Sequence, residues 1–282
     1  MANTTVYDVI TDRFIQRIEQ ENTLPWRQPW DPKMGLPRNA LTGKQYRGIN
    51  FLMLWHLHED ARYATMKQAN QAGGKVRKGA QSIPIVFWTS VTRDKDNGEE
   101  ETIPIARYYR VFHVGDIEGA TWNIPPDAPE MPIPATIGDI LRDMPDTPVL
   151  KHDGQGMAYY EPLTDSIHLP PMAAFSSPEM YAGTVLHELV HSTGHVDRLD
   201  RDLTKLAPFG SDSYSREELT AEIGASFVAA RSGIPTEFDH HASYVAGWLK
   251  ILMGDSRAIV IAAGKAQKAA DYILGTEVTE SD

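Results

Sequence analysis

Residues 184–195 read TVLHELVHSTGH, and residues 187–191 within them form the pattern His-Glu-x-x-His. In an α-helix, His187 and His191 differ by only about 40° in direction, so both imidazoles project from one face toward one ion. Glu188 lies about 100° from His187, beside that ion, where it can hold a water molecule without becoming a ligand. The pattern predicts a metal-carrying helix with Glu188 as the catalytic base.

The residues around the pentad favour a helix that ends soon after it. Ser176 or Ser177 can cap its start, Pro178 suits its first turn, and Gly194 follows its last turn. The alternative interpretation is a helix with two packed histidines, since chance placement would produce the pentad in roughly 2% of such chains. A third ligand would separate the two interpretations, because a hydrolytic zinc site takes three protein ligands and a water.

Several side chains could supply that third ligand. His195 continues the four-residue spacing, but Gly194 before it indicates that the helix has ended. A second helix is predicted over 215–231, where Glu218 and Glu222 share one face. Close approach of this helix to the first is favoured by three small residues, Ala221, Gly224 and Ala225. The candidate ligands are therefore His195, Glu217, Glu218 and Glu222, with His240 and His241 less favourable.

The composition indicates a globular protein and excludes several other classes. The chain has 282 residues, 41% hydrophobic and 23% charged, which excludes collagen, a coiled coil and wholesale disorder. No apolar run approaches the roughly 18 residues of a membrane helix, and the N-terminus lacks a signal-peptide pattern, so we expect a soluble, cytoplasmic protein without a membrane partner. The absence of cysteine leaves His, Asp and Glu for any metal or acid-base chemistry.

The pattern of elements predicts an α+β fold with two domains. Residues 1–124 are expected to hold helices followed by a small antiparallel sheet, with helices at 4–20, 48–61 and 65–74 and a hairpin of 82–92 with 102–114. Seven prolines between Pro125 and Pro148 predict a Pro-rich linker over 125–150. Residues 151–282 are expected to form a mainly helical domain, with a hairpin at 156–170 and further helices at 241–252 and 256–274.

The charge is divided unevenly, although the formal net charge of the chain is −11. Residues 1–124 carry 16 Lys and Arg against 14 Asp and Glu, so the negative charge lies in the C-terminal half. Residues 24–92 carry ten basic and three acidic side chains, a footprint that suits a polyanion. Basic, aromatic and amide side chains are interleaved there, namely Trp26, Arg27, Trp30, Arg38, Asn39, Lys44, Tyr46, Arg47, Asn50, Lys67, Gln68, Lys75, Arg77 and Lys78.

Such a mixture is typical of a surface for single-stranded nucleic acid. Cations follow the phosphates, while exposed rings stack on bases for about 1 to 3 kcal/mol each. The alternative interpretation is that Trp26 and Trp30 anchor a proline-rich loop on the core and that the lysines solvate a surface. Duplex recognition is less favoured, because no helix-turn-helix or zinc-finger pattern is present.

The N-terminal motifs resemble a known family. PWRQPW at 25–30, PRNALTGKQYRGIN at 37–50 and KQANQAGGKVRKG at 67–79 are similar to the single-stranded-DNA-binding domain of ArdC-type antirestriction proteins and TraC-type primases. In ArdC-type proteins a zincin domain follows, and its motifs resemble HELVHSTGH at 187–195, REELTAE at 216–222 and AGKAQKAADYI at 263–273. The resemblance therefore spans nearly the whole chain.

The resemblance implies roles for the acidic residues of the second helix. In zincin metallopeptidases with a glutamate as third ligand, an E-x-x-A-D pattern supplies the ligand first and an outer carboxylate second. Carried over, Glu218 binds the metal and Glu222 orients a ligand histidine. Because Glu222 stands where that pattern has an aspartate, the two roles could be exchanged. The expected cofactor is zinc, with manganese or cobalt as alternatives.

The function that the resemblance implies is protection of incoming conjugative plasmid DNA from restriction. The expected partners are single-stranded DNA and a restriction protein or another DNA-bound protein, and the expected enzyme is a zinc-dependent metallopeptidase. One alternative hypothesis is a DNA-guided metalloprotease that acts on proteins attached to DNA. Another is a DNA-binding protein whose metal site is only structural.

Overall fold

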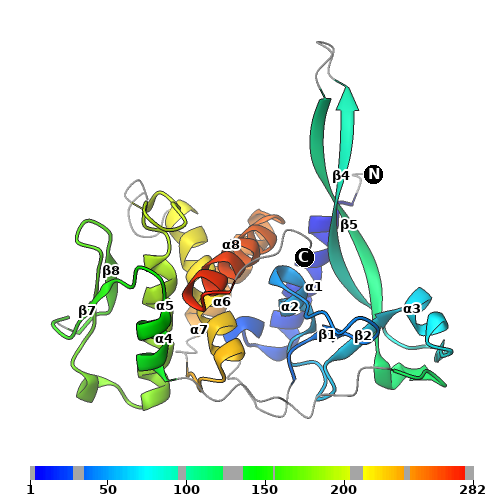
Figure 1. Cartoon of the computed structure of the whole chain (residues 1–282), viewed down its shortest axis with the longest axis horizontal. Helices are drawn as coiled ribbons and strands as arrows, with labels where there is room; N and C mark the ends of the chain where they lie inside the picture. Colours follow the sequence, from blue (N-terminus) through cyan, green and yellow to red (C-terminus); the bar gives the residue numbers. More distant parts are fainter. Residues whose placement is uncertain are drawn as a thin grey trace.

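The computed structural model of the chain describes residues 4–27, 35–94, 100–122, 136–154, 156–203, 212–237 and 242–276 (Figure 1). Its helices are α1 (Val6–Glu21), α2 (Gly48–Leu54), α3 (Met66–Gln71), α4 (Ile137–Asp143), α5 (Pro178–Ser192), α6 (Asp212–Ser232), α7 (Ala242–Gly254) and α8 (Ala258–Ile273), with 3-10 helices η1 (Pro25–Arg27), η2 (Val114–Asp116) and η3 (Met172–Ala174). Its strands are β1 (Arg38–Asn39), β2 (Arg62–Thr65), β3 (Lys75–Val76), β4 (Ile83–Asp94), β5 (Glu100–His113), β6 (Ile117–Glu118), β7 (Val149–Lys151), β8 (Tyr159–Glu161) and β9 (Ser166–His168). The predicted α+β class is confirmed. Within these ranges, no helix combines the length and apolarity that a membrane span requires.

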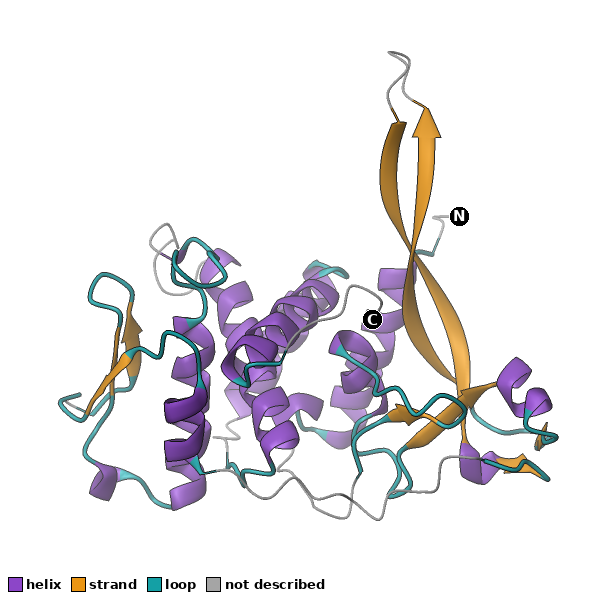
Figure 2. Ribbon diagram, in the orientation of Figure 1, coloured by secondary structure: helices purple, strands orange, loops and turns teal. Residues whose placement is uncertain are grey.

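A long β-hairpin dominates the sheet of the N-terminal half. The strand order is β1-β2-β5-β4, and β4 pairs antiparallel with β5 from Ile83–Val111 to Asp94–Glu100, which confirms the predicted hairpin. On β5, β2 pairs with the last residues alone, from Thr65–Val111 to Tyr63–His113. Because β2 covers only the root of the hairpin, its distal part extends away from the rest of the molecule (Figure 2).

The first helix begins and buries its apolar side as its sequence predicts. Thr5 and Asp8 form a capping box, in which the Thr5 hydroxyl accepts a hydrogen bond from the Asp8 amide at 3.2 Å. Ile10, Phe14 and Ile18 lie on one face and are buried. α1 therefore packs against the core through one apolar face.

Helices α5 and α6 pack closely in the C-terminal half, beside a three-stranded sheet of order β7-β9-β8. The Ser177 hydroxyl caps α5 by accepting a hydrogen bond from the Met180 amide at 3.0 Å. A Cβ atom added at Gly224 of α6 would lie 2.8 Å from the Val190 methyl carbons of α5. Glycine is therefore required for this close approach, as the small residues of α6 predict.

One buried apolar cluster runs through both halves of the chain. The Phe51 ring of α2 meets the Phe227 ring of α6 edge to face at 5.0 Å, and α1 packs on α7. In the expected linker, residues 123–135 lie outside the described residues, and α4 buries Ile140 in the same cluster. The two halves expected as separate domains therefore share a continuous core.

Polar contacts join the same two halves. The buried indole Nε1 of Trp26 donates a hydrogen bond to a Glu222 oxygen of α6 at 2.9 Å, and the Ser226 hydroxyl donates to the Trp26 carbonyl. Arg47, before α2, pairs with Asp271 of α8. The proline-rich loop that follows α1 is thus attached to a helix of the C-terminal half.

We expect Trp26→Ala to destabilise the protein strongly, by about 3 to 5 kcal/mol, because it removes a fully buried indole and its hydrogen bond to Glu222. The matched control is Trp88→Ala, since half of the Trp88 side chain is exposed. Urea unfolding of the full chain measures both free energies. Equal losses of stability in the two variants would contradict the structural role of Trp26.

Candidate metal centre

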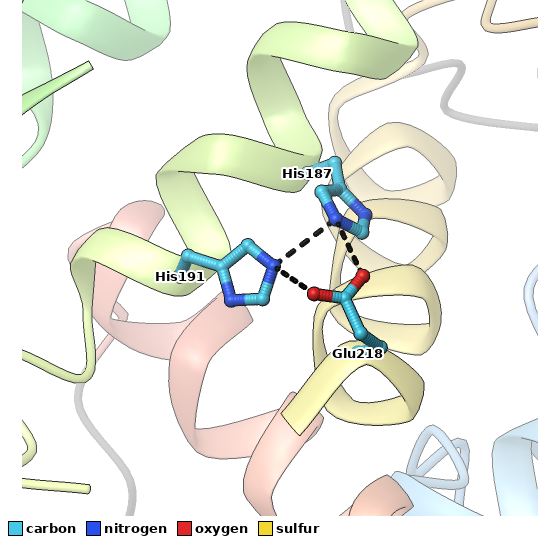
Figure 3. Close-up of side chains that lie close together, drawn as sticks. All are labelled: His187, His191 and Glu218. Atoms are coloured by element: carbon cyan, nitrogen blue, oxygen red, sulfur yellow. Dashed lines mark hydrogen bonds and ion pairs between the residues drawn. The ribbon is translucent and has the colours of Figure 1, made fainter. Parts of the chain in front are cut away.

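Two histidines of α5 face the same point. The pentad occupies the last turns of α5, and the Nε2 atoms of His187 and His191 lie 3.1 Å apart. Their rings meet edge to face, with centroids 4.7 Å apart (Figure 3). The predicted helical arrangement of the pair is confirmed.

A glutamate of α6 meets both histidines. One Glu218 oxygen lies 3.4 Å from the His187 Nε2 atom, and the other lies 3.4 Å from the His191 Nε2 atom (Figure 3). Four-coordinate zinc with ligands at 2.0–2.2 Å would place its donors about 3.4 Å apart. Among the described residues, these three form the group whose donor atoms converge closely enough for a metal ion. The spacing and chemistry of the donors therefore suit a divalent cation.

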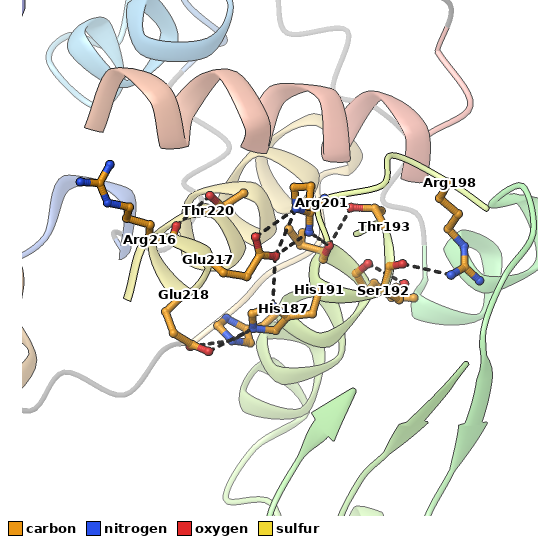
Figure 4. A network of polar contacts seen from close by, with 12 residues as sticks. His187, His191, Ser192, Thr193, Arg198, Arg201, Arg216, Glu217, Glu218 and Thr220 are labelled. Carbon is orange, nitrogen blue, oxygen red and sulfur yellow. Dashed lines mark hydrogen bonds and ion pairs between the residues drawn. The ribbon is translucent and has the colours of Figure 1, made fainter. Parts of the chain in front are cut away.

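Glu217, the neighbour of Glu218, contacts the other nitrogen of a histidine. The His191 Nδ1 atom lies 3.3 Å from a Glu217 oxygen, which also accepts a hydrogen bond from Arg201 Nη2 at 2.7 Å (Figure 4). Arg201 also donates to the Val190 carbonyl and the Thr193 hydroxyl, both at 2.7 Å. Glu217 and Arg201 are buried, so their pair holds the His191 ring in one orientation.

The histidine contact that the resemblance implies for Glu222 is made by Glu217 instead, which corrects that expectation. Glu222 lies one turn beyond Glu218, about 6 Å further along the helix axis, and accepts its bond from Trp26. His195 also lies apart from the cluster, because α5 ends at Ser192 and the His195 Nδ1 atom accepts a hydrogen bond from the Asp197 amide. Sequence reasoning did not single out Arg201, which lies in the loop after α5.

The electrostatics of the cluster follow from these contacts. Burial alone would lower the pKa of His191, but hydrogen bonds to Glu217 and Glu218 outweigh burial and raise the pKa to about 10. Burial alone would raise the pKa of Glu218, but hydrogen bonds to His187 and His191 hold it well below its usual range. The carboxylates around the two histidines therefore favour a bound cation. Binding of a metal ion would release a proton from His191.

Glu188 follows His187 on α5, and its side chain is buried. Its negative charge contributes to the raised pKa of His191, which places the carboxylate within electrostatic reach of the cluster. A buried carboxylate beside a candidate metal site is the arrangement that a general base requires.

Known proteins match this arrangement over both halves of the chain. Residues 4–112 match the N-terminal domain of the anti-restriction factor ArdC, and residues 144–265 match the zincin-like metallopeptidase family. The metal-free crystal structure of the antirestriction protein ArdC from plasmid R388 is 35% identical and covers 97% of this chain and 99% of its own, with a TM-score of 0.74. The chain belongs to the ArdC family.

Other relatives of this ArdC-family chain differ in length. An Escherichia coli DNA primase TraC is 36% identical over 96% of the chain, but the match spans only 27% of the primase. An uncharacterized Sinorhizobium fredii protein, y4eC, is 34% identical, with 92% of its length covered. The Mn(II)-bound R388 ArdC structure matches with a TM-score of 0.75 and 34% identity, covering 96% of this chain and 97% of its own. The zincin-like match and the His/Glu cluster confirm the predicted divalent-metal centre.

The predicted DNA-contacting residues of this ArdC-family chain fall into two groups. Trp26 is fully buried, which corrects the expectation that it stacks on a base. Trp30 and the side chain of Arg27 lie outside the described residues. Six others lie within the fold or have partners there, rather than forming an open surface, namely Arg38, Asn39, Tyr46, Arg47, Asn50 and Gln68.

Hydrogen bonds account for the positions of the polar members of this group. The side-chain nitrogen of Asn39 donates a hydrogen bond to the Gln68 side-chain oxygen at 3.1 Å. The side-chain oxygen of Asn39 accepts hydrogen bonds from the backbone amides of Leu41 and Thr42. Asn50 donates to and accepts from the Val86 backbone, both at 2.7 Å. Their functional groups hold backbone segments together, which explains their positions within the fold, and a DNA contact by these amides stays a prediction.

The remaining candidates are exposed cations. Lys67 lies on α3, Lys75 lies on β3, and Arg77 and Lys78 lie in the loop after β3, whereas Lys44 lies in the turn between β1 and α2. Arg77 pairs with Asp116 of η2, which follows β5 directly. The basic surface of the ArdC-family chain therefore lies at the root of the long hairpin.

Proposed function

We propose that the chain is a divalent-metal-dependent peptidase that binds single-stranded DNA and protects incoming plasmid DNA from restriction in the recipient cell. The observation that carries the peptidase part is the convergence of His187, His191 and Glu218 at spacings that suit one ion. The ArdC-type match over residues 4–112 and the exposed cations support the DNA part. A restriction protein or another DNA-bound protein is the proposed target.

In the proposed mechanism, His187, His191 and Glu218 hold the ion, either zinc or manganese. The bound ion supplies Lewis acidity toward the scissile carbonyl and makes a water molecule more acidic. Glu188 accepts a proton from that water at its carboxylate and later donates it to the leaving amine. Glu217 and Arg201 keep His191 oriented throughout.

The proposed peptide-binding element is strand β8. It lies at an edge of the β7-β9-β8 sheet and contacts α5, the helix of the pentad. An edge strand presents free backbone groups, so an extended peptide can pair with it main chain to main chain. This placement would bring the scissile bond near the cluster on α5.

The DNA part is tested by a salt titration on the full chain, because the shared core makes an isolated N-terminal half unsuitable. We expect Lys67→Gln, Lys75→Gln and Lys78→Gln combined to weaken binding of labelled single-stranded DNA. The slope of log affinity against log salt should become shallower by about 2, because each phosphate contact contributes about 0.7. Fluorescence anisotropy at several salt concentrations measures both effects.

The matched control removes the same charge from three exposed lysines of the C-terminal half, Lys250, Lys265 and Lys268. This control should retain the slope of the unchanged chain. Equal slopes in all three proteins would remove the basic surface from the DNA site.

One observation favours a second function, a DNA-guided metalloprotease for which protection from restriction is incidental. Trp26 of η1 is bonded to Glu222, one turn from Glu218, so the proline-rich loop connects directly with the helix of the candidate metal centre. A DNA strand that moved this loop would also move α6. Cleavage that increases on addition of DNA and stops with a chelator would support this second function.

A further inference from the structure

Four aromatic rings are exposed on the stem of the β4–β5 hairpin, defined as residues 83–93 and 102–113. The exposed fractions are 54% for Phe87, 50% for Trp88, 42% for Tyr108 and 45% for Tyr109. Tyr108 and Tyr109 lie on β5 just before the residues that pair with β2, and Phe87 and Trp88 lie on β4 next to the residues that face these tyrosines. Beyond them the hairpin extends from the molecule (Figure 1). A cluster of exposed rings marks an interaction surface.

The strand register distributes these rings between two faces. Phe87 pairs with Arg107 and Ile85 pairs with Tyr109, so Phe87, Arg107 and Tyr109 share one face. The Phe87 and Tyr109 rings meet edge to face at 5.8 Å. On the other face, Trp88 lies diagonal to Tyr108, and Arg110 is two residues further along the strand. Each face therefore combines two rings with an arginine.

The charge of the stem indicates the partner. The stem contains Arg93, Arg107 and Arg110 and no aspartate or glutamate, whereas the whole chain has a net charge of −11. The acidic residues of the two strands, Asp94, Glu100 and Glu101, lie beyond the stem at the far end of the hairpin. Rings for stacking and cations for phosphates are the two groups that single-stranded nucleic acid requires. The hairpin root adjoins the exposed cations, because β6 follows β5 through η2 and pairs with β3 at Lys75.

We propose that single-stranded DNA binds along the stem of the β4–β5 hairpin. Its bases stack on Phe87, Trp88, Tyr108 and Tyr109, and its phosphates contact Arg107 and Arg110. The strand then continues over the cations at the root. The inference rests on the proposed DNA-binding function and supplies the aromatic part of the site, because Trp26 is buried and Tyr46 is half-buried against the core.

The test uses the full chain and a fluorescein-labelled oligothymidylate. Two double variants remove the rings of one face each, Phe87→Ala with Tyr109→Ala and Trp88→Ala with Tyr108→Ala. We expect at least one of them to bind about 10-fold to 100-fold more weakly, with an unchanged salt slope, because stacking is lost and no charge is removed. The control is Leu163→Ala, an exposed apolar residue far along the chain that should bind like the unchanged protein.

A second pair of changes keeps the test valid if ring removal disturbs the hairpin. Arg107→Gln with Arg110→Gln should retain the circular dichroism spectrum and make the salt slope shallower by about 1.4. Normal affinity and slope in all stem variants, with clear binding by the unchanged chain, would overturn the hairpin site while leaving the proposed DNA function intact. Absence of binding by the unchanged chain would overturn both. A change of oligomeric state without a change of DNA affinity would identify the stem as a self-association surface and also overturn the proposal.

Discussion

Replacing Glu188 with glutamine is expected to lower peptide cleavage by about 10²-fold to 10⁴-fold, the usual contribution of a general base, while bound metal stays unchanged. Glutamine has the shape of glutamate but cannot accept the proton from water. His187, His191 and Glu218 stay in place in this variant, so the ion should still bind. Cleavage of a mixed protein substrate, together with elemental analysis of the purified variant, measures the two properties separately.

The control for this change is Glu179→Gln, in the first turn of the same helix and away from the cluster. It should cleave at the rate of the unchanged protein. Unimpaired cleavage by Glu188→Gln would exclude Glu188 as the base. Conjugation into a restricting recipient adds a biological readout, because protection that survives Glu188→Gln would assign it to DNA binding rather than to proteolysis.

Glu218→Ala removes one of the three proposed ligands, so we expect a large loss of metal affinity. The loss should exceed the 10-fold to 100-fold that is usual when a residue that only hydrogen-bonds to a ligand is removed. Glu217→Gln should fall in that 10-fold to 100-fold range, since Glu217 contacts the far nitrogen of His191 rather than the ion. Competition with a chelator measures all three affinities, those of the two variants and of the unchanged chain.

Glu222→Gln is the matched control, because it neutralises a carboxylate of the same helix that points to Trp26. It should retain the metal affinity of the unchanged chain. Retention of metal by Glu218→Ala, with loss in Glu222→Gln, would exchange the two roles and contradict the geometry of the cluster.

Polar contacts add to the shared core in joining the two halves. Arg47 pairs with Asp271, and Asp271 also accepts a hydrogen bond from Arg231 of α6 at 2.7 Å. Trp26 reaches the same helix at Glu222. Glu218 and Glu222 are one turn apart on α6, so the Trp26 contact reaches the helix that carries the third proposed metal ligand.

Local periodicity explains which parts could be predicted. The direction of His187 relative to His191 depends only on the helical repeat, and the β4–β5 hairpin follows from two β-branched and aromatic runs about a polar turn. Both features are set by neighbours in the sequence, so both were anticipated. The resemblance to ArdC-type proteins was confirmed by matches over both halves.

The sequence by itself therefore determined the pentad helix, the hairpin and the choice of acidic residues near 217–222. Only the tertiary structure decided that Glu218 meets the histidines, that Glu217 holds His191 and that Glu222 turns to Trp26. The rotation of α6 is set by its close packing at Gly224 against Val190. Exposure is likewise a non-local property, because Trp26 is buried by a helix almost 200 positions later, whereas among the described strands β2 pairs with β5 only at residues 111–113 and leaves the four rings of the stem exposed.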